Sequence, residues 1–289
     1  MIDPNFLQNK NYMKKTLLLL LLPLFFQLSA QESAEDVINK SEKHFKKKEY
    51  KEAMTDLNDG LIKMPDSTKL YLQRGNLNLT YQLFDKAESD FTLGLKISMD
   101  TNEKVIFLIN RSSAKTSVRN FEGAYTDMKQ ALELDSNNIG AYSNLAYITD
   151  ELHRPDEALI YYNKIIEIDP KFSPVYVNLG YRSQLADEHE KALEYFNTAV
   201  KLSPKEPLIY SNRSFSKLKT NDLKGARKDI EKSLKIFPSN SYAYKIRALI
   251  LIEEGNKEEA CEDLFLANKR GYTEQYGTEV NELMRKHCN

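Results

Sequence analysis

Glycine and proline are scarce in this chain, which has 10 glycines and 9 prolines among 289 residues. Long flexible linkers are rich in these residues, so their scarcity argues against a second, independently folded domain. Hydrophobic residues make up 41% of the chain, which is ample for a continuous interior, and the 29% of charged residues can cover the outer surfaces. These proportions favour one elongated domain.

Catalytic and metal-binding signatures are also missing. The sequence has no glycine-rich phosphate loop, no nucleophile elbow and no helical motif of paired histidines. None of the four histidines has a second histidine or a cysteine at the helical spacing that a metal site needs. His153 has Asp150 and Glu157 within a turn on either side, but a histidine in solvent or in the core is the simpler interpretation. We therefore expect no enzyme activity, no cofactor and no metal.

A surplus of basic residues is absent as well. The net charge of the whole chain is −1, and removing residues 1–30, which hold three lysines and one aspartate, leaves −3. Helical repeats that read RNA need a basic inner face on which bases stack. A weakly acidic chain lacks the electrostatic footprint of a nucleic-acid-binding protein, so we expect no nucleic-acid partner.

Residues 1–30 differ in character from the rest of the chain. Two lysines precede an apolar run at residues 17–26, and a short stretch that ends with Ala30 follows it. This three-part pattern predicts a secretory signal peptide with cleavage after Ala30 and, because the residues before Met13 are mostly polar, a natural start at Met13. The apolar run is too short to span a bilayer. We expect an exported protein, periplasmic or secreted, without a membrane segment after cleavage.

Beyond the leader, alanine recurs with separations of 34, 37, 34, 34, 34 and 34 residues, at Ala53, Ala87, Ala124, Ala158, Ala192, Ala226 and Ala260. With alanine at position 20 of a 34-residue repeat, the repeats start at Ala34, Thr68, Val105, Ile139, Ser173, Pro207 and Ser241. Positions 8 and 27 are then nearly always small, whereas positions 4 and 24 are large. Small residues at fixed phase mark the crossings of stacked helix pairs.

This pattern resembles the tetratricopeptide repeat family over residues 34–272. The resemblance implies an all-α fold, a right-handed α–α superhelix with seven helix pairs in residues 31–272 and a C-terminal capping helix in residues 273–289. The chain departs from the family at position 7, where five repeats carry lysine or arginine instead of leucine. We expect the three extra residues between repeats two and three to lengthen the polar turn at residues 100–104.

The residues at position 7 vary together with those at position 23. Five repeats combine a basic residue with an aspartate, in the combinations Lys40 and Asp56, Arg74 and Asp90, Arg111 and Asp127, Arg213 and Asp229, and Arg247 and Asp263. The other two repeats combine leucine with tyrosine, Leu145 with Tyr161 and Leu179 with Tyr195. This covariation predicts partly buried ion pairs between the two helices of a repeat, and pairing with the adjoining repeat is the alternative.

The first helices of the repeats line a concave groove if the family resemblance holds. Position 6 of these helices carries Asn39, Gln73, Asn110, Asn144, Asn178 and Asn212, with Ile246 in repeat seven. An amide both donates and accepts hydrogen bonds, so this ladder can hold an extended peptide by its backbone with little regard for sequence. Some family members use asparagines in this way. The alternative is that these side chains only stay hydrated in the groove.

Position 9 adds an aromatic run, Tyr147, Tyr181 and Phe215, beside small hydroxyl residues. Such a lining suits adaptable contact with a polypeptide, and Asp150 with Glu151 can attract a basic side chain. The alternative is that the aromatic run packs as core. Family members that bind the acidic C-terminal tail of a chaperone use basic residues beside the asparagines. These positions lack them, so that activity is not implied.

Only two cysteines occur, Cys261 in the second helix of repeat seven and Cys288 near the C-terminus. Apolar residues at helical spacing predict a capping helix over residues 273–287, with Gly277 as its weak point. In an oxidising compartment two cysteines on packed helices are expected to form a disulfide. Two reduced, buried cysteines are the alternative.

We interpret the chain as an exported, non-enzymatic adaptor that binds a protein, or an extended segment of one, in the groove. The candidate contact residues are Asn39, Asn110, Asn144, Asn178, Asn212, Tyr147, Tyr181, Asp150 and Glu151. Two alternatives remain: a structural subunit that assembles through its convex faces, and a carrier of a glycan or another small ligand. An exposed apolar convex patch would favour the first, and a deep tyrosine-walled pocket the second. The oligomeric state stays open.

Overall fold

The computed structural model describes residues 32–288 of the chain. The predicted signal peptide, its cleavage after Ala30 and the predicted start at Met13 lie outside the described residues. Within residues 32–288 the regular secondary structure consists of sixteen helices, and there is no strand. The predicted all-α class is therefore confirmed.

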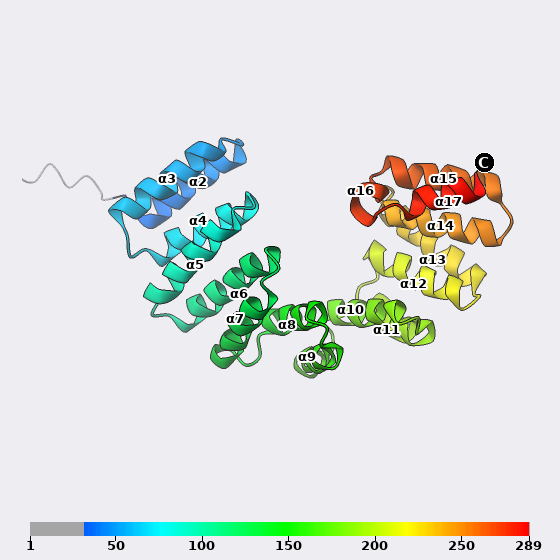
Figure 1. Ribbon diagram of the computed structural model, residues 1–289, viewed down its shortest axis with the longest axis horizontal. Coiled ribbons are helices and arrows are strands. Elements are labelled where there is room, and N and C mark those ends of the chain that lie inside the picture. The colour runs from blue at the N-terminus through cyan, green and yellow to red at the C-terminus, as the bar shows by residue number, and fades with distance from the viewer. Residues whose placement is uncertain (1–31, 289) are drawn as a thin grey trace, which may run out of the picture. The chain divides into compact units, whose positions relative to one another are not determined.

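Fourteen of the helices form seven consecutive pairs, one pair for each repeat (Figure 1). The pairs are α2 (Ala34–Lys46) with α3 (Tyr50–Lys63), α4 (Thr68–Thr80) with α5 (Phe84–Ile97), α6 (Thr101–Ser117) with α7 (Phe121–Leu134), α8 (Ile139–Glu151) with α9 (Pro155–Ile168), α10 (Ser173–Leu185) with α11 (His189–Leu202), α12 (Pro207–Lys219) with α13 (Leu223–Ile236), and α14 (Ser241–Glu253) with α15 (Lys257–Lys269). The predicted architecture of stacked helix pairs is confirmed.

Contacts between the helices divide the chain into two compact parts, which meet in the sequence between Asp135 and Ser136. In the N-terminal part, α2 contacts α4 and α4 contacts α6. In the C-terminal part, α10 contacts α12 and α12 contacts α14. The first helices of repeats one to three, and those of repeats five to seven, therefore lie next to one another. No helix among residues 32–288 combines the length and the hydrophobicity needed to cross a membrane.

The small residues lie where the two helices of a repeat cross. All seven alanines at position 20 are completely buried. In repeats two and five the crossing is tight, because a β-carbon added to Gly75 would lie 2.4 Å from the ring of Phe91, and one added to Gly180 would lie 2.6 Å from Phe196. Glycine at position 8 thus makes room for phenylalanine at position 24.

Serine at position 8 serves the crossing in another way. The hydroxyls of Ser41, Ser112 and Ser214 each donate a hydrogen bond to the backbone carbonyl of the alanine at position 20, at 2.8, 3.1 and 2.8 Å. A small hydroxyl therefore fits the narrow crossing and also satisfies its own hydrogen-bonding capacity there.

The predicted ion pairs join the two helices in all five repeats that carry the basic residue and the aspartate. The shortest nitrogen–oxygen distances are 2.6–2.7 Å in Lys40–Asp56, Arg74–Asp90, Arg111–Asp127, Arg213–Asp229 and Arg247–Asp263. Pairing within the repeat is confirmed. In repeat four, by contrast, Leu145 and Tyr161 occupy positions 7 and 23, and both are buried.

Two features of these ion pairs were not predicted from the sequence. Arginine also bonds to position 25 of the preceding repeat, since Arg74 donates to Asn58 at 2.8 Å and Arg213 donates to Asn197 at 3.0 Å. In repeats three and six a lysine at position 11 adds a second cation to the aspartate, at 2.8 Å in each case. The sequence could have indicated this second cation, because Lys115 and Lys217 lie one helical turn after the arginine and share its face.

The turns between paired helices have one conformation. Position 15 has a left-handed backbone in every repeat, with φ of 58–64° at Lys48, Gln82, Arg119, His153, Asp187 and Asn221, and 82° at Gly255. Side chains other than glycine adopt this conformation at a cost. In six of the seven repeats the residue at position 15 is not glycine, so these repeats carry that conformational cost.

The three extra residues before repeat three do not lengthen a turn, so that prediction is wrong. They extend α6, which has 17 residues where α4 has 13. Asp100 caps this longer helix, accepting a hydrogen bond from the backbone N–H of Glu103 at 2.8 Å. The Glu103 carboxylate in turn accepts from the hydroxyl of Ser98 at 2.8 Å. This capping favours helix over turn.

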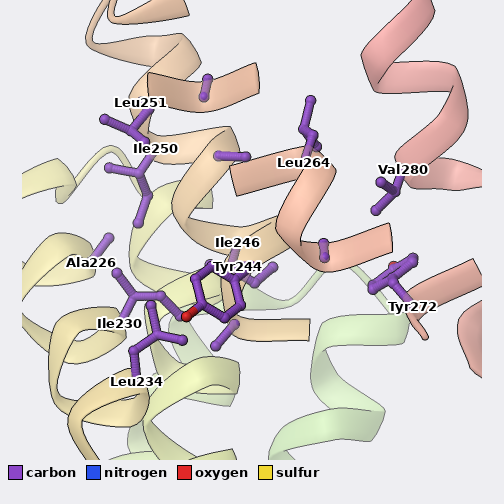
Figure 2. Close-up of a cluster of buried hydrophobic side chains, with 14 residues drawn as sticks. Ala226, Ile230, Leu234, Tyr244, Ile246, Ile250, Leu251, Leu264, Tyr272 and Val280 are labelled. Atoms are coloured by element: carbon purple, nitrogen blue, oxygen red, sulfur yellow. The ribbon is translucent and has the colours of Figure 1, made fainter. Parts of the chain in front are cut away.

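The capping segment forms two helices, α16 (Tyr272–Tyr276) and α17 (Glu279–His287), so the prediction of one helix over residues 273–287 is wrong. Gly277 separates them with a φ of 92°, which interrupts the helical hydrogen bonds. Tyr272 and Val280 of these helices belong to the same core cluster as residues of α13, α14 and α15 (Figure 2). The segment thus covers the apolar end of repeat seven.

Cys261 of α15 and Cys288, directly after α17, are joined by a disulfide with an S–S distance of 2.05 Å. This bond links the last residues of the capping segment to the second helix of repeat seven. The capping segment is therefore held by apolar packing at Val280 and by a covalent bond at Cys288.

Candidate functional site

The amide residues at position 6 lie on the first helices, in two groups. Asn39, Gln73 and Asn110 belong to α2, α4 and α6, and Asn144, Asn178 and Asn212 belong to α8, α10 and α12. Asn39 and Asn178 are exposed and the other four are half-buried. All six therefore reach the surface.

In the N-terminal part, one of the three position 6 amides lines a hollow between α2 and α4. This hollow has a volume of about 120 Å³, and Glu42, Phe45, Gln73 and Asn76 are among its lining residues. Gln73 is the position 6 residue of repeat two. This small hollow between two first helices thus brings amide, acidic and aromatic side chains together.

In the C-terminal part, aromatic side chains accompany the amides. Tyr147 of α8 is 50% exposed and Tyr181 of α10 is 51% exposed. Phe215 of α12 is more enclosed: the ring of His189 packs edge-on against it, with 5.7 Å between ring centroids. We call the three amides together with Tyr147 and Tyr181 the inner surface of repeats four to six.

The acidic residue Asp150 finds its partner within the chain. The guanidinium of Arg182 on α10 donates a hydrogen bond to the Asp150 carboxylate on α8, and also one to the carbonyl of Pro155 at 3.2 Å. The phenol of Tyr162 lies 3.5 Å from the same carboxylate. Burial lowers the pKa of Arg182, but an arginine remains charged. Asp150 thus ties repeats four and five together, and Glu151 follows it as the last residue of α8.

Gln184, at position 12 of repeat five, also makes contacts inside the chain. Its side-chain amide donates to the backbone carbonyl of Asn212 and to the hydroxyl of Ser216, both at 2.7 Å. These bonds join α10 to α12. The polar residues at the edge of the inner surface therefore fix neighbouring helices relative to one another.

The capping segment contacts the first helix of repeat seven. Lys245 of α14 is only 5% exposed, and its ammonium lies 2.9 Å from the carboxylate of Glu279 on α17. The same ammonium lies 5.4 Å from the ring centroid of Phe215 and 5.6 Å from that of Tyr242. The two aromatic rings and the carboxylate together stabilise the charge of this buried ammonium.

Tyrosines complete this end of the surface. The ring centroids of Tyr242 on α14 and Tyr276 on α16 are 5.7 Å apart, and the phenol of Tyr272 donates to Glu279 at 3.0 Å. Burial raises the pKa of Tyr242 and of Tyr272, so both phenols stay protonated. Ile246, which interrupts the series of amides, is completely buried in the adjoining core. The series of amides therefore ends at repeat six.

The structure gives His153 the role of a turn residue. It lies at position 15, in the turn between α8 and α9, with a φ of 58°. Its nearness in sequence to Asp150 and Glu157 is therefore explained by the turn. Among residues 32–288 no group of three or more histidine, cysteine, aspartate or glutamate side chains is placed to hold a metal ion.

A second depression lies away from the amides. It has a volume of about 740 Å³ and opens beside the disulfide, between α15 and α17, with Phe265 and Leu266 among its lining residues. None of the position 6 amides lines it. It is shallow and belongs to the end of the chain, whereas the amides recur along the repeats.

Comparison with known proteins supports the helical-repeat architecture. A family model described as tetratricopeptide repeat matches residues 139–172 and 173–206, which are repeats four and five. RNA polymerase II-associated protein 3 of Xenopus laevis is 30% identical over 122 residues, which are 42% of this chain and 18% of that protein. The chain thus spans less than a fifth of the length of this curated relative.

Solved structures share the fold at low sequence identity. A tetratricopeptide repeat protein from Parabacteroides merdae superimposes with a TM-score of 0.68 at 20% identity, over 88% of this chain and 98% of that chain. The C-terminal part of a tetratricopeptide repeat-containing protein from Cytophaga hutchinsonii gives 0.58 at 17% identity, over 84% and 98%. Repeats four and five match the tetratricopeptide repeat model, and the described chain shares the fold of these solved structures.

Proposed function

We propose that this protein is a non-enzymatic adaptor of the cell envelope that binds an extended polypeptide segment along the first helices of its repeats. The observation that carries the proposal is the inner surface of repeats four to six, where Asn144, Asn178 and Asn212 recur with one amide per repeat and Tyr147 and Tyr181 stand half-exposed beside them. Amides at a regular spacing match the regular carbonyls and N–H groups of an extended backbone.

The surroundings of this surface support a passive binding role. Asp150 is compensated by Arg182 and Lys245 by Glu279, so these charges stabilise the protein itself. Catalysis needs a nucleophile, acid or base held ready for a substrate. The amides and phenols of the inner surface supply contacts that hold a ligand.

An envelope location rests on two observations. The lysines and apolar run before Ala30 have the three-part pattern of a signal peptide. The disulfide between Cys261 and Cys288 suits an oxidising compartment outside the cytoplasm.

Site-specific photo-crosslinking in the native envelope tests the proposal. A benzophenone amino acid replaces Tyr181 on the inner surface or, as a matched control, Ile160 on α9, which is 64% exposed. We expect a crosslinked polypeptide from position 181 and none from position 160. Crosslinks to a second copy from position 160 alone would favour assembly through the convex face instead. Crosslinks to carbohydrate from position 181 would favour the glycan carrier.

A further inference from the structure

The chemistry of the inner surface narrows the class of polypeptide that fits it. The surface offers amide donors and tyrosine faces, and the adjacent charges are compensated within the chain, Asp150 by Arg182 and Lys245 by Glu279. A strongly charged segment would find no uncompensated partner among these residues. Electrostatic complementarity therefore favours an uncharged segment with flat apolar groups and exposed carbonyls.

The spacing of the helices narrows the class of polypeptide further. Packed helices have axes about 8–10 Å apart; α10 and α12 are in contact, and Arg182 of α10 bonds to Asp150 of α8. A polyproline II helix has three residues per turn and rises about 3.1 Å per residue, so one turn advances about 9 Å. Each repeat therefore presents one amide and one position 9 side chain for every turn of such a ligand, whereas a fully extended strand places a side chain on the same face about every 7 Å.

Hydrogen bonding points to the same ligand. A polyproline II segment has no internal hydrogen bonds, and its prolines have no N–H, so it presents mostly carbonyl acceptors. The NH₂ groups of Asn178 and Asn212 are donors of the kind that such carbonyls need. Tyrosine faces pack against pyrrolidine rings in aromatic-lined grooves that bind proline-rich segments.

We infer that the inner surface of repeats four to six binds a neutral, proline-rich segment in the polyproline II conformation, with its rings against Tyr147 and Tyr181 and its carbonyls bonded to the amides. This inference rests on the proposed peptide-binding function and specifies its ligand. The preformed conformation of such a segment lowers the ordering cost of binding.

Two blocked, neutral nine-residue peptides test the inference by titration calorimetry with the purified protein. One contains three repeats of Pro-Pro-Gln, about 28 Å long as polyproline II, and the other contains three repeats of Gly-Ser-Gln. We expect the proline-rich peptide to bind at least tenfold more tightly. The double variant Tyr147→Ala, Tyr181→Ala should lose at least tenfold of that affinity, the double variant to Phe should keep most of it, and Ile160→Ala should leave it unchanged.

The outcomes separate this inference from the proposed function. Equal binding of the two peptides, with both weakened by the alanine variant, would overturn the polyproline II inference and leave peptide binding on the same surface intact. Absence of binding by the proline-rich peptide would also overturn it, and the crosslinks from position 181 would still decide the proposed function. Unchanged unfolding curves of the tyrosine variants would establish that the affinity change comes from the surface.

Discussion

Repeats three and four form the same kind of helix pair with opposite chemistry between positions 7 and 23. In repeat three Arg111 and Lys115 surround Asp127, whose side chain is 1% exposed. In repeat four Leu145 and Tyr161 occupy positions 7 and 23, and the hydroxyl of Thr149 at position 11 donates to the carbonyl of Leu145 in its own helix. Both pairs nevertheless bury their position 20 alanine completely. The small residues thus set the helix crossing, and positions 7 and 23 need only match each other.

This difference also bears on recognition of the repeats. The family model matches the two repeats with leucine at position 7, and the five repeats with a basic residue there fold in the same way. The charged pair and the apolar pair are therefore both compatible with the same helix-pair architecture.

The largest effect is expected at Asp127, where the comparison can be broken most sharply. Asp127→Ala leaves Arg111 and Lys115 without their partner, and removing one partner of a buried pair costs about 3–5 kcal/mol. Asp56→Ala in repeat one should cost under about 1 kcal/mol, because Lys40 is 59% exposed and solvent takes over its charge. Urea unfolding of both variants measures the difference.

A control distinguishes a stranded charge from lost packing. The triple variant Arg111→Leu, Lys115→Thr, Asp127→Tyr gives repeat three the residues of repeat four at these positions. Replacing a buried ion pair by packed apolar residues is often neutral or better, so the triple variant should be more stable than Asp127→Ala alone. A triple variant that unfolds more easily would show that the two chemistries are not interchangeable.

The next largest effect concerns the ends of the repeat series. Repeat seven has a capping segment linked by the disulfide, whose two cysteines have a sequence separation of 27. The chain-entropy model gives roughly 3–4 kcal/mol for a loop of this size. Reduction, or Cys288→Ser, should lower stability by up to that amount and raise hydrogen exchange in α17 before it does so in α14. Two free thiols in the denatured, unreduced exported protein would show that the bond does not form in the cell.

The parts of the fold that followed from the sequence were those set by periodicity. Position 20 alanines, the pairing of Arg213 with Asp229 and the existence of a cap all depend on side-chain size or charge at fixed spacing. The extension of α6 depends on Asp100 acting as a helix cap, and a polar segment of this kind is compatible with either helix or turn. The break at Gly277 depends on a single backbone conformation.

The candidate site was predictable only in its residue types. The amides and tyrosines were identified because they recur in register. The engagement of Asp150 with Arg182 was not identified, because position 10 carries no repeated pattern and the contact crosses from one repeat to the next. Contacts between repeats depend on how the pairs stack, and the 34-residue period alone does not determine this.

Repeats four and five also carry two adjacent amides of the inner surface, which gives a test of binding. The double variant Asn144→Ala, Asn178→Ala removes hydrogen bonds worth about 0.5–1.5 kcal/mol each. It should weaken binding of the crosslinked partner, or of the proline-rich peptide, by roughly one to two decades in calorimetry. If the folded variant binds with unaltered affinity, the partner must contact another face of the protein.

A smaller effect is expected at the tight crossings of repeats two and five. Gly75→Ala places a methyl group 2.4 Å from the ring of Phe91, and overpacking of this kind costs about 1–3 kcal/mol. Adding Phe91→Leu gives repeat two the combination of Ala248 and Leu264 found in repeat seven, and should recover part of the loss. Additive costs in thermal unfolding would show that positions 8 and 24 do not compensate each other.

The smallest effect on stability is expected at position 15, where His153 of repeat four and Gly255 of repeat seven share the left-handed conformation. This conformation costs a side chain about 1–2 kcal/mol, and glycine offsets part of that gain by losing about 0.5–1 kcal/mol more entropy on folding. His153→Gly should therefore stabilise the protein by about 0.5–1 kcal/mol in urea unfolding. His153→Asn, which matches Asn221 of repeat six, should fall between the two, because asparagine tolerates this conformation better than histidine does. A loss of stability in the glycine variant would mean that the imidazole makes contacts worth more than the backbone strain.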